Sequence, residues 1–301
     1  MRHIVTIDDF DVLDLDRLFF RVLGYKQRTA ASFPRKILAT IFYEPSTRTR
    51  LSFESAMIRL GGSVIGSEQA GIFSSAIKGE SLEDSIRVIS GYANVIALRH
   101  PDAGSARRAA DVSDVPLINA GDGDNEHPTQ ALLDLFTIWE AAKKGLIPSR
   151  GLVVSFRGDN RMSRTVHSLA RMLDRYAARV GLGIESVRFD GTADCAKPGD
   201  AFLTSLSPGL VSDSASGGPH IVYLTRFQKE RHSTEKEGEL PTFTARDAEL
   251  LPENSIVMHP LPRTSELHAS VDTNPRARYF TQARNGTPVR MALLAELLAP
   301  D

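Results

Sequence analysis

The chain has little cysteine, almost no net charge and no long apolar run, and each shortage narrows what it can be. Cys195 is the single cysteine among 301 residues, which excludes an intrachain disulfide and a metal cage built from several thiolates. The formal net charge of −1 leaves no overall basic field for nucleic acid or a membrane surface. No apolar stretch approaches spanning length, and the first residues lack the apolar core of a signal peptide. We therefore expect a cytoplasmic protein with no nucleic-acid or membrane partner, whose anion sites are local.

The chain does have the composition of a globular protein, and its 301 residues are enough for two domains with substantial cores. Apolar runs typical of buried strands alternate with segments of helical period, and this order predicts parallel α/β sheets. We expect strands at residues 37–42, 64–66, 95–98, 115–119, 152–156, 184–189, 221–224 and 255–258. We expect helices at residues 7–23, 51–60, 80–89, 105–112, 128–139, 164–176 and 291–298.

A linker candidate lies near the middle of the chain. Residues 145–151 combine Gly, Pro and Ser between two α/β alternations, so we place a domain boundary there. The expected fold class is α/β, with two domains of similar size that are each a parallel sheet flanked by helices. The first domain would cover residues 1–145 and the second residues 151–285. Residues 286–301 would form a C-terminal helix that packs back on the first domain.

The most informative stretch lies between the first predicted strand and the helix after it. Residues 46–50 read Ser-Thr-Arg-Thr-Arg and occupy the turn. The free N–H groups and the positive dipole end of a helix N-terminus attract anions, and hydroxyl and guanidinium groups add donors that suit phosphate oxygens. An N-capped helix with two solvated arginines is the alternative. The alternation of hydroxyl and Arg residues directly after a buried strand favours a phosphate or carboxylate site.

Other polar residues fall just past a predicted strand or at the start of the next helix. They are Arg99 and His127 in the first half, and Arg164, Arg226 and Gln228 in the second. Functional residues of parallel sheets gather beyond the carboxyl ends of the strands. With Lys78, the residues of the second half form a cationic set, and we expect the two sets to face each other across a cleft. Separate solvated surface charges are the alternative.

Six motifs, in order along the chain, carry a family resemblance. They are Phe-Tyr-Glu-Pro-Ser-Thr-Arg-Thr-Arg (residues 42–50), Arg-His-Pro (99–101), His-Pro-Thr-Gln (127–130), Arg-Thr-Val-His-Ser (164–168), Thr-Arg-Phe-Gln-Lys-Glu-Arg (225–231) and His-Pro-Leu-Pro-Arg (259–263). Together they resemble the aspartate/ornithine carbamoyltransferase family over most of the chain. The ornithine branch usually has Cys where this chain has Thr129 and Pro260, and it lacks the Arg-x-Gln of residues 226–228. The resemblance therefore points to the catalytic chain of the aspartate branch.

The resemblance implies transfer of the carbamoyl group of carbamoyl phosphate to the amine of L-aspartate in pyrimidine synthesis, with no cofactor and no metal. By the same resemblance, Ser46, Thr47, Arg48, Thr49 and Arg99 would bind the phosphate, and Thr49, Arg99 and His127 would hold the carbamoyl oxygen. Gln130 and the carbonyls of Pro260 and Leu261 would orient the carbamoyl nitrogen. Lys78, Arg164, Arg226 and Gln228 would hold the two carboxylates of aspartate. Arg48, Thr49, Arg99 and His127 would be catalytic, with His127 a neutral donor at a helix start rather than a general base.

The resemblance also implies how the chain assembles and moves. Ser74 and Lys78 match loop residues that the family donates into a neighbouring subunit's site, which implies a homotrimer, open to regulatory or dihydroorotase chains. Glu44 matches a residue that bridges on domain closure to arginines of the second domain, here Arg164 and Arg231. A capping or surface pair is the alternative for Glu44. The Leu261–Pro262 bond matches one that is cis in the family.

Two departures from the family pattern leave the acceptor amine open. Phe227 stands where the family usually has a smaller aliphatic residue, and residues 191–219 are shorter and more broken than the expected strand and helix. A carbamoyltransferase that uses a different amine in specialised metabolism is therefore a second hypothesis. A non-catalytic homologue is a third, and it is disfavoured because a scaffold needs no such polar set.

Overall fold

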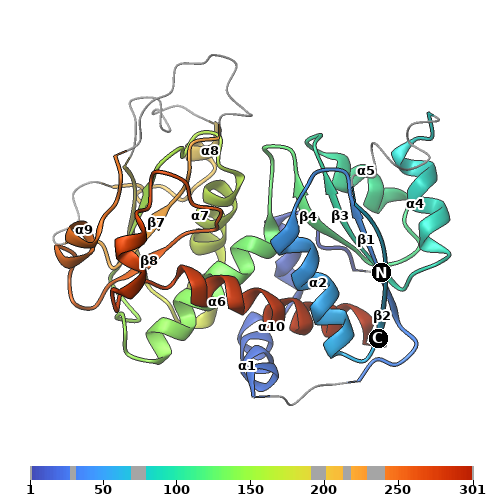
Figure 1. Cartoon of the computed structure of the whole chain (residues 1–301), viewed down its shortest axis with the longest axis horizontal. Helices are drawn as coiled ribbons and strands as arrows, with labels where there is room; N and C mark the ends of the chain where they lie inside the picture. Colours follow the sequence, from blue (N-terminus) through green and yellow to red (C-terminus); the bar gives the residue numbers. More distant parts are fainter. Residues whose placement is uncertain are drawn as a thin grey trace. The chain divides into compact units, whose positions relative to one another are not determined.

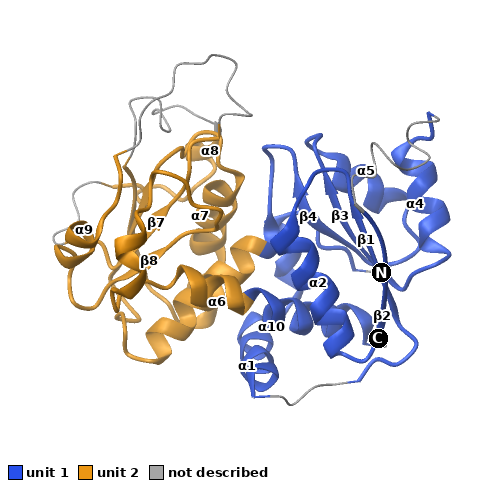
Figure 2. Cartoon of the chain, viewed as in Figure 1, with its two compact units in different colours: residues 1–129, 286–301 blue, residues 130–285 orange. Residues whose placement is uncertain are grey.

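The computed structural model describes residues 2–27, 32–68, 79–190, 201–212, 218–228 and 241–299. The chain forms two compact units, which Figure 1 shows coloured along the sequence and Figure 2 shows coloured by unit. Unit 1 comprises residues 1–129 and 286–301, and unit 2 comprises residues 130–285. The C-terminal segment thus returns to the first unit, as the sequence predicts. Within the described residues, no helix combines the length and apolar character needed to cross a membrane.

Unit 1 is built on a four-stranded parallel sheet in the order β2-β1-β3-β4. Its strands are β1 (Ile37–Phe42), β2 (Ser63–Glu68), β3 (Val95–His100) and β4 (Leu117–Asp122). Its helices are η1 (Ile7–Val12), α1 (Leu15–Lys26), α2 (Thr47–Arg59), α4 (Leu82–Ser90) and α5 (Ser105–Val112), with the start of α6 (Pro128–Lys143) and the end of α10 (Tyr279–Leu298). The central strands form because they are apolar on both faces, and Ile41 and Leu98 share one core cluster with Ile86 and Ala109 of the helices.

The first residues of the chain also join this sheet. Ile4 pairs in parallel with Ile118 of β4. The Ile4 N–H donates to the Leu117 carbonyl (2.8 Å), and the Asn119 N–H donates to the Ile4 carbonyl (2.7 Å). The Asn119 side chain donates in addition to the Val5 carbonyl (2.9 Å). The start of the chain is thereby fixed beside β4.

Unit 2 repeats the strand order of unit 1, since its parallel sheet runs β6-β5-β7-β8. Its strands are β5 (Leu152–Arg157), β6 (Ile184–Asp190), β7 (Ile221–Leu224) and β8 (Ile256–Met258). Its helices are α7 (Arg164–Tyr176), η3 (Ala178–Val180), α8 (Ala201–Thr204), α9 (Ala245–Glu249) and η5 (Ala269–Thr273), with most of α6 and the start of α10. Val222 and Val257 of the sheet pack with Phe243, Val271 and Tyr279 in one core cluster.

This shared strand order determines where each unit can bind a ligand. In each sheet the first and third strands are neighbours, β1 with β3 and β5 with β7. The connections that leave such a pair run to opposite faces, so the pair forms a switch point. Ligands of open parallel sheets bind beyond the carboxyl ends of the strands at that point.

The helix expected at residues 7–23 is wrong, because the segment forms two elements. η1 ends at Val12 and α1 begins at Leu15. Asp14 is the cause, since its side chain accepts the Arg17 N–H (3.0 Å) and so caps a new helix. An amphipathic pattern runs through both elements and hides this break.

The C-terminal helix begins at Tyr279, well before the expected start at residue 291. Residues 285–288 read Asn-Gly-Thr-Pro, which favours a break, yet α10 continues through them with Pro288 inside. The Asn285 amide is buried and donates to Thr137 Oγ1 (3.0 Å) and Glu140 Oε2 (3.3 Å) on α6. These contacts between α10 and α6 outweigh the preference of the Asn-Gly-Thr-Pro segment for a break in the helix.

Candidate active site

The β1–α2 turn, residues 43–46, lies at the switch point of unit 1. β1 pairs in parallel with β3, and Phe42 is the partner of Arg99. The Tyr43 N–H donates to the Arg99 carbonyl (2.8 Å), which extends the pairing past the end of β1. The turn and Arg99 therefore lie at the same edge of neighbouring strands.

The N-terminus of α2 follows this turn directly. Ser46 is the N-cap, and the Arg50 N–H donates to its carbonyl (3.0 Å). Within the described residues, the Ser46 hydroxyl makes no capping bond, and the first turn of α2 carries no acidic side chain. The positive end of the helix is thus arranged to suit an external anion.

The side chains of the Ser-Thr-Arg-Thr-Arg run divide into two groups. Thr47 and Arg48 are exposed, whereas Thr49 is buried. Arg50 Nε lies 2.7 Å from Glu54 Oε1, which also accepts the Thr40 hydroxyl (3.1 Å). One arginine of the motif is therefore held by an ion pair along α2, and Arg48 is the exposed guanidinium of the turn.

Arg99 forms an ion pair with Glu44 inside unit 1. Arg99 Nε lies 3.2 Å from Glu44 Oε2, and the two side chains are 14% and 29% exposed. The sequence predicts Arg164 and Arg231 as partners of Glu44 on closure. Arg231 lies outside the described residues, as do Ser74 and Lys78.

His127 lies at the end of the loop from β4 to α6 and is buried. Two buried carboxylates hold this loop. Asp122 accepts the Asn119 side-chain amide (2.8 Å), and Glu126 Oε2 accepts the Ile7 N–H (2.7 Å). The sequence interpretation overlooks both carboxylates, although polar residues that directly follow an apolar strand are a usable signal for them.

The switch point of unit 2 carries the Arg-x-Gln segment. The Thr225 N–H donates to the Arg157 carbonyl (2.8 Å), so β5 and the chain after β7 stay paired to the edge of the sheet. Gly158 has φ +125°, and a Cβ atom there would lie 2.1 Å from the Thr225 carbonyl oxygen. Only glycine fits this close approach. Arg226 and Gln228 follow directly, and both are half-buried.

Buried Asp159 fixes that segment, and the sequence interpretation overlooks it. Its Oδ2 accepts the Gln228 N–H (3.0 Å), and its Oδ1 accepts the Met162 N–H (3.3 Å). These bonds connect the Arg-x-Gln segment to the turn before α7, whose first residue is the buried Arg164. The structure thus brings Arg164, Arg226 and Gln228 to one edge of the unit 2 sheet.

The loop after β8, residues 259–263, carries Pro260 and Leu261. The Leu261–Pro262 peptide is cis, as the resemblance implies, and Leu261 has φ +54°. His259 Nδ1 accepts the Leu261 N–H (2.8 Å), so the ring proton lies on Nε2, which donates to Glu266 (2.8 Å). Burial favours the neutral acid, but hydrogen bonds from His259 and Thr264 lower the pKa of Glu266 to about 2.

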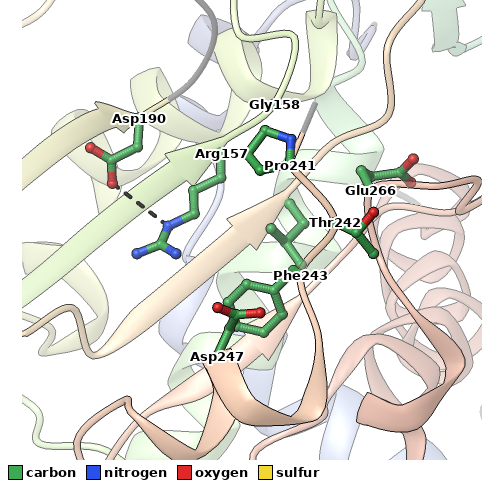
Figure 3. Close-up of a pocket in the computed structure, with 9 residues that line it drawn as sticks. Arg157, Gly158, Asp190, Pro241, Thr242, Phe243, Asp247 and Glu266 are labelled. Atoms are coloured by element: carbon green, nitrogen blue, oxygen red, sulfur yellow. Dashed lines mark ion pairs between the residues drawn. The ribbon is translucent and has the colours of Figure 1, made fainter. Parts of the chain in front are cut away.

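A cavity of about 450 Å³ also opens at this end of unit 2 (Figure 3). Its described lining comprises Arg157, Gly158, Asp190, Leu224, Pro241, Thr242, Phe243, Asp247 and Glu266. In Figure 3, Arg157 and Asp190 point toward each other, with 3.7 Å between Nε and Oδ2. That described lining includes none of the residues that the sequence predicts to bind substrate.

Two family models together match nearly the whole chain. Residues 2–140 match the carbamoyl-P binding domain of aspartate/ornithine carbamoyltransferase, and residues 150–297 match the Asp/Orn binding domain. The aspartate carbamoyltransferase catalytic subunit of Thermoplasma volcanium is 41% identical over 308 residues, covering 99% of this chain and 98% of that protein.

Solved structures agree with these matches. The catalytic subunit of M. jannaschii aspartate transcarbamoylase aligns with a TM-score of 0.82 at 39% identity, covering 99% of this chain and 98% of that one. Aspartate transcarbamoylase from Trypanosoma cruzi, in complex with carbamoyl aspartate and phosphate, aligns with a TM-score of 0.86 at 34% identity, covering 99% and 96%. The architecture is that of a two-domain α/β transferase. The chain belongs to the aspartate/ornithine carbamoyltransferase family.

Proposed function

We propose that the protein transfers the carbamoyl group of carbamoyl phosphate to the amine of L-aspartate, giving N-carbamoyl-L-aspartate and phosphate. The observation that carries the proposal is the full-length match to aspartate carbamoyltransferases. One aligned structure holds carbamoyl aspartate and phosphate, the products of this reaction. The reaction would serve pyrimidine synthesis in the cytoplasm and would need no cofactor or metal.

Unit 1 would bind carbamoyl phosphate at the β1–α2 turn. Ser46, Thr47, Arg48, Thr49 and Arg99 would hold the phosphate at the positive end of α2. Thr49, Arg99 and His127 would donate hydrogen bonds to the carbamoyl oxygen. Negative charge develops on that oxygen during attack, and each well-placed donor is worth about 3 kcal/mol of transition-state stabilisation.

Unit 2 would bind the acceptor. Arg164, Arg226 and Gln228 would hold the two carboxylates of aspartate, together with Lys78. The anchoring of the Arg-x-Gln segment by Asp159 supports this assignment, because it fixes the segment before any ligand binds. Gln130 and the carbonyls of Pro260 and Leu261 would accept hydrogen bonds from the carbamoyl nitrogen.

The bond changes balance without a covalent intermediate on the protein. The amine lone pair of aspartate forms the new C–N bond, while the bond from the carbamoyl carbon to the phosphate oxygen breaks. Phosphate leaves with that electron pair and accepts the proton that the amine loses. Arg48 would stabilise the departing phosphate, and holding both substrates in line removes a large entropic barrier.

The decisive experiment incubates the protein with carbamoyl phosphate and a panel of amines, and follows both phosphate and the ureido product. The panel includes aspartate, asparagine and ornithine, which differ in the second carboxylate. We expect turnover with aspartate. If only another amine is carbamoylated, that amine is the acceptor instead of aspartate, which is the possibility that Phe227 raises. The absence of any turnover would favour a non-catalytic homologue.

We also propose a homotrimer in which Ser74 and Lys78 of one subunit complete the site of the next. The motif resemblance supports this assembly. Lys78→Ala and Arg48→Ala would each be inactive alone. If sites are shared, mixed trimers of the two variants contain some sites with both residues intact, so reassembly restores activity. Unshared sites would stay inactive in every mixture, and light scattering would report the number of chains.

A further inference from the structure

A buried carboxylate on α6, Asp134, connects the groups that would recognise the carbamoyl nitrogen. Its side chain is fully buried. Oδ1 accepts Gln130 Nε2 (2.9 Å) and Gln282 Nε2 (2.7 Å), and Oδ2 accepts the Tyr223 hydroxyl (2.7 Å). A carboxylate at this depth needs such donors, because burying it without them is strongly unfavourable. All four residues belong to unit 2.

The first connection fixes the orientation of Gln130. A carboxylate accepts hydrogen bonds and cannot donate them, so Gln130 must turn its NH₂ group toward Asp134. Its carbonyl oxygen then points the other way. Gln130 is half-buried, and within the described residues that oxygen receives no hydrogen bond. Asp134 thereby makes Gln130 an acceptor toward any ligand beside it.

The second connection reaches the loop after β8. The same constraint turns the NH₂ group of Gln282 toward Asp134, so its Oε1 is free to accept the His259 N–H (2.9 Å). His259 in turn accepts the Leu261 N–H. Leu261 has φ +54°, a conformation that side-chain-bearing residues adopt only when their surroundings hold it. This chain of hydrogen bonds supplies that hold.

Tyr223 is a third donor to Asp134. Burial, together with the charge and hydrogen bond of Asp134, raises the pKa of Tyr223 well above 10. The hydroxyl therefore stays protonated and donates to Asp134 at all working pH values.

We propose that Asp134 is a positioning residue that makes Gln130 and the loop after β8 into acceptors for an NH₂ group. It would thereby select a carbamoyl group over an acetyl group, which carries a methyl in that place. This inference rests on the proposed function. Sites built to hydrogen-bond a substrate NH or OH reject analogues lacking it by factors on the order of 10⁴.

The test compares carbamoyl phosphate with acetyl phosphate in Asp134→Asn. This substitution keeps the volume and adds an NH₂ donor, so Gln130 can turn its own carbonyl inward and present NH₂ to the ligand. We expect the KM for carbamoyl phosphate to rise at least tenfold while the inhibition constant of acetyl phosphate changes less than twofold. Inhibition by inorganic phosphate, which reports on the unit 1 donors, should not change.

Glu140→Gln is the matched control. Glu140 is a second buried carboxylate of α6, and it accepts Lys144 Nζ (2.9 Å) and Asn285 Nδ2 (3.3 Å). We expect the wild-type ratio of the two constants in this variant even where stability falls. If Asp134→Asn does not fold, Gln282→Leu cuts only the connection to the loop. The inhibition constant of acetyl phosphate divided by the KM for carbamoyl phosphate should then fall at least threefold.

Failure of the proposed function and failure of the positioning role give different experimental results. A wild-type protein that does not carbamoylate any amine would remove the proposed function. A wild-type protein that is active, with a folded Asp134→Asn variant that keeps the wild-type ratio, would overturn the positioning role alone.

Discussion

Glu44 Oε2 lies 3.2 Å from Arg99 Nε, where β1 and β3 end side by side. The carboxylate therefore lies beside the Nε edge of a guanidinium that we propose as a phosphate ligand. If Arg99 binds the phosphate as proposed, the anion competes with Glu44 for that guanidinium. The competition predicts that removing the charge of Glu44 strengthens the binding of phosphate.

We expect Glu44→Gln to bind inorganic phosphate about 1.4- to fivefold more tightly, because partly exposed ion pairs are worth about 0.2–1 kcal/mol. Calorimetric titration gives the dissociation constant, and added salt should shrink the gain. Glu83→Gln is the control, since Glu83 pairs with Arg108 at the same 3.2 Å distance elsewhere in unit 1. Unchanged or weaker phosphate binding in Glu44→Gln would contradict the competition.

Arg48→Ala should reduce kcat/KM by about 10²–10³ while leaving the fold intact, because it would remove the exposed guanidinium that we propose to stabilise the departing phosphate. Arg59→Ala removes a guanidinium at the other end of the same helix and should leave the rate unchanged. Steady-state kinetics and a thermal melt of each variant provide the comparison. Wild-type activity in Arg48→Ala would remove Arg48 from the site.

Gly158→Ala should disturb the acceptor side of the site. A Cβ atom there meets the Thr225 carbonyl oxygen at 2.1 Å, and Arg226 is the next residue. We expect a loss of about 3 kcal/mol or more in unfolding free energy and a raised KM for aspartate.

Gly181→Ala separates the clash from the backbone strain. Gly181 also has positive φ, at +78°, but a Cβ atom at this position would meet no other atom within 4 Å. The variant should lose only about 1 kcal/mol and keep the KM for aspartate. Urea denaturation gives both free energies, and equal losses in the two variants would argue against close contact at Gly158.

Glu266 makes stability depend on pH in the acid range. Its pKa is about 2 in the folded chain against an ordinary value of 4.5, so its contribution is fully present above pH 4.5 and is lost as the pH falls toward 2. The difference corresponds to about 3 kcal/mol at most. The gap in unfolding free energy between wild type and Glu266→Gln should therefore narrow from pH 6 to pH 3. A gap that does not change over this range would show that the His259–Glu266 bond does not depend on the carboxylate charge.

The sequence predicts the elements best where local chemistry decides them. β1, α5 and α7 have the predicted bounds, because the apolar run of the strand and the helical periods of the two helices begin and end there. The start of α10 is missed because a buried asparagine, whose contacts come from α6, overrides an Asn-Gly-Thr-Pro break.

The residues of the site also divide into those that local sequence predicts and those that depend on distant contacts. The residues that we propose to contact substrate follow strand ends, so the chain itself predicts their positions at the edge of each sheet. A holding residue on a helix is harder to find, because one acidic residue there has the pattern of a solvated charge. Asp134 shows why, because its partner Gln282 lies 148 positions away in the sequence.

The pairing of Ile4 with β4 and the bond from the Ile7 amide to Glu126 connect residues 4–7 to the loop that carries His127. They brace the residue immediately before His127. A preparation trimmed by proteolysis at its amino end would be expected to keep both sheets and yet hold carbamoyl phosphate poorly. Affinity handles for biochemical work are therefore better attached after α10 than before Ile4.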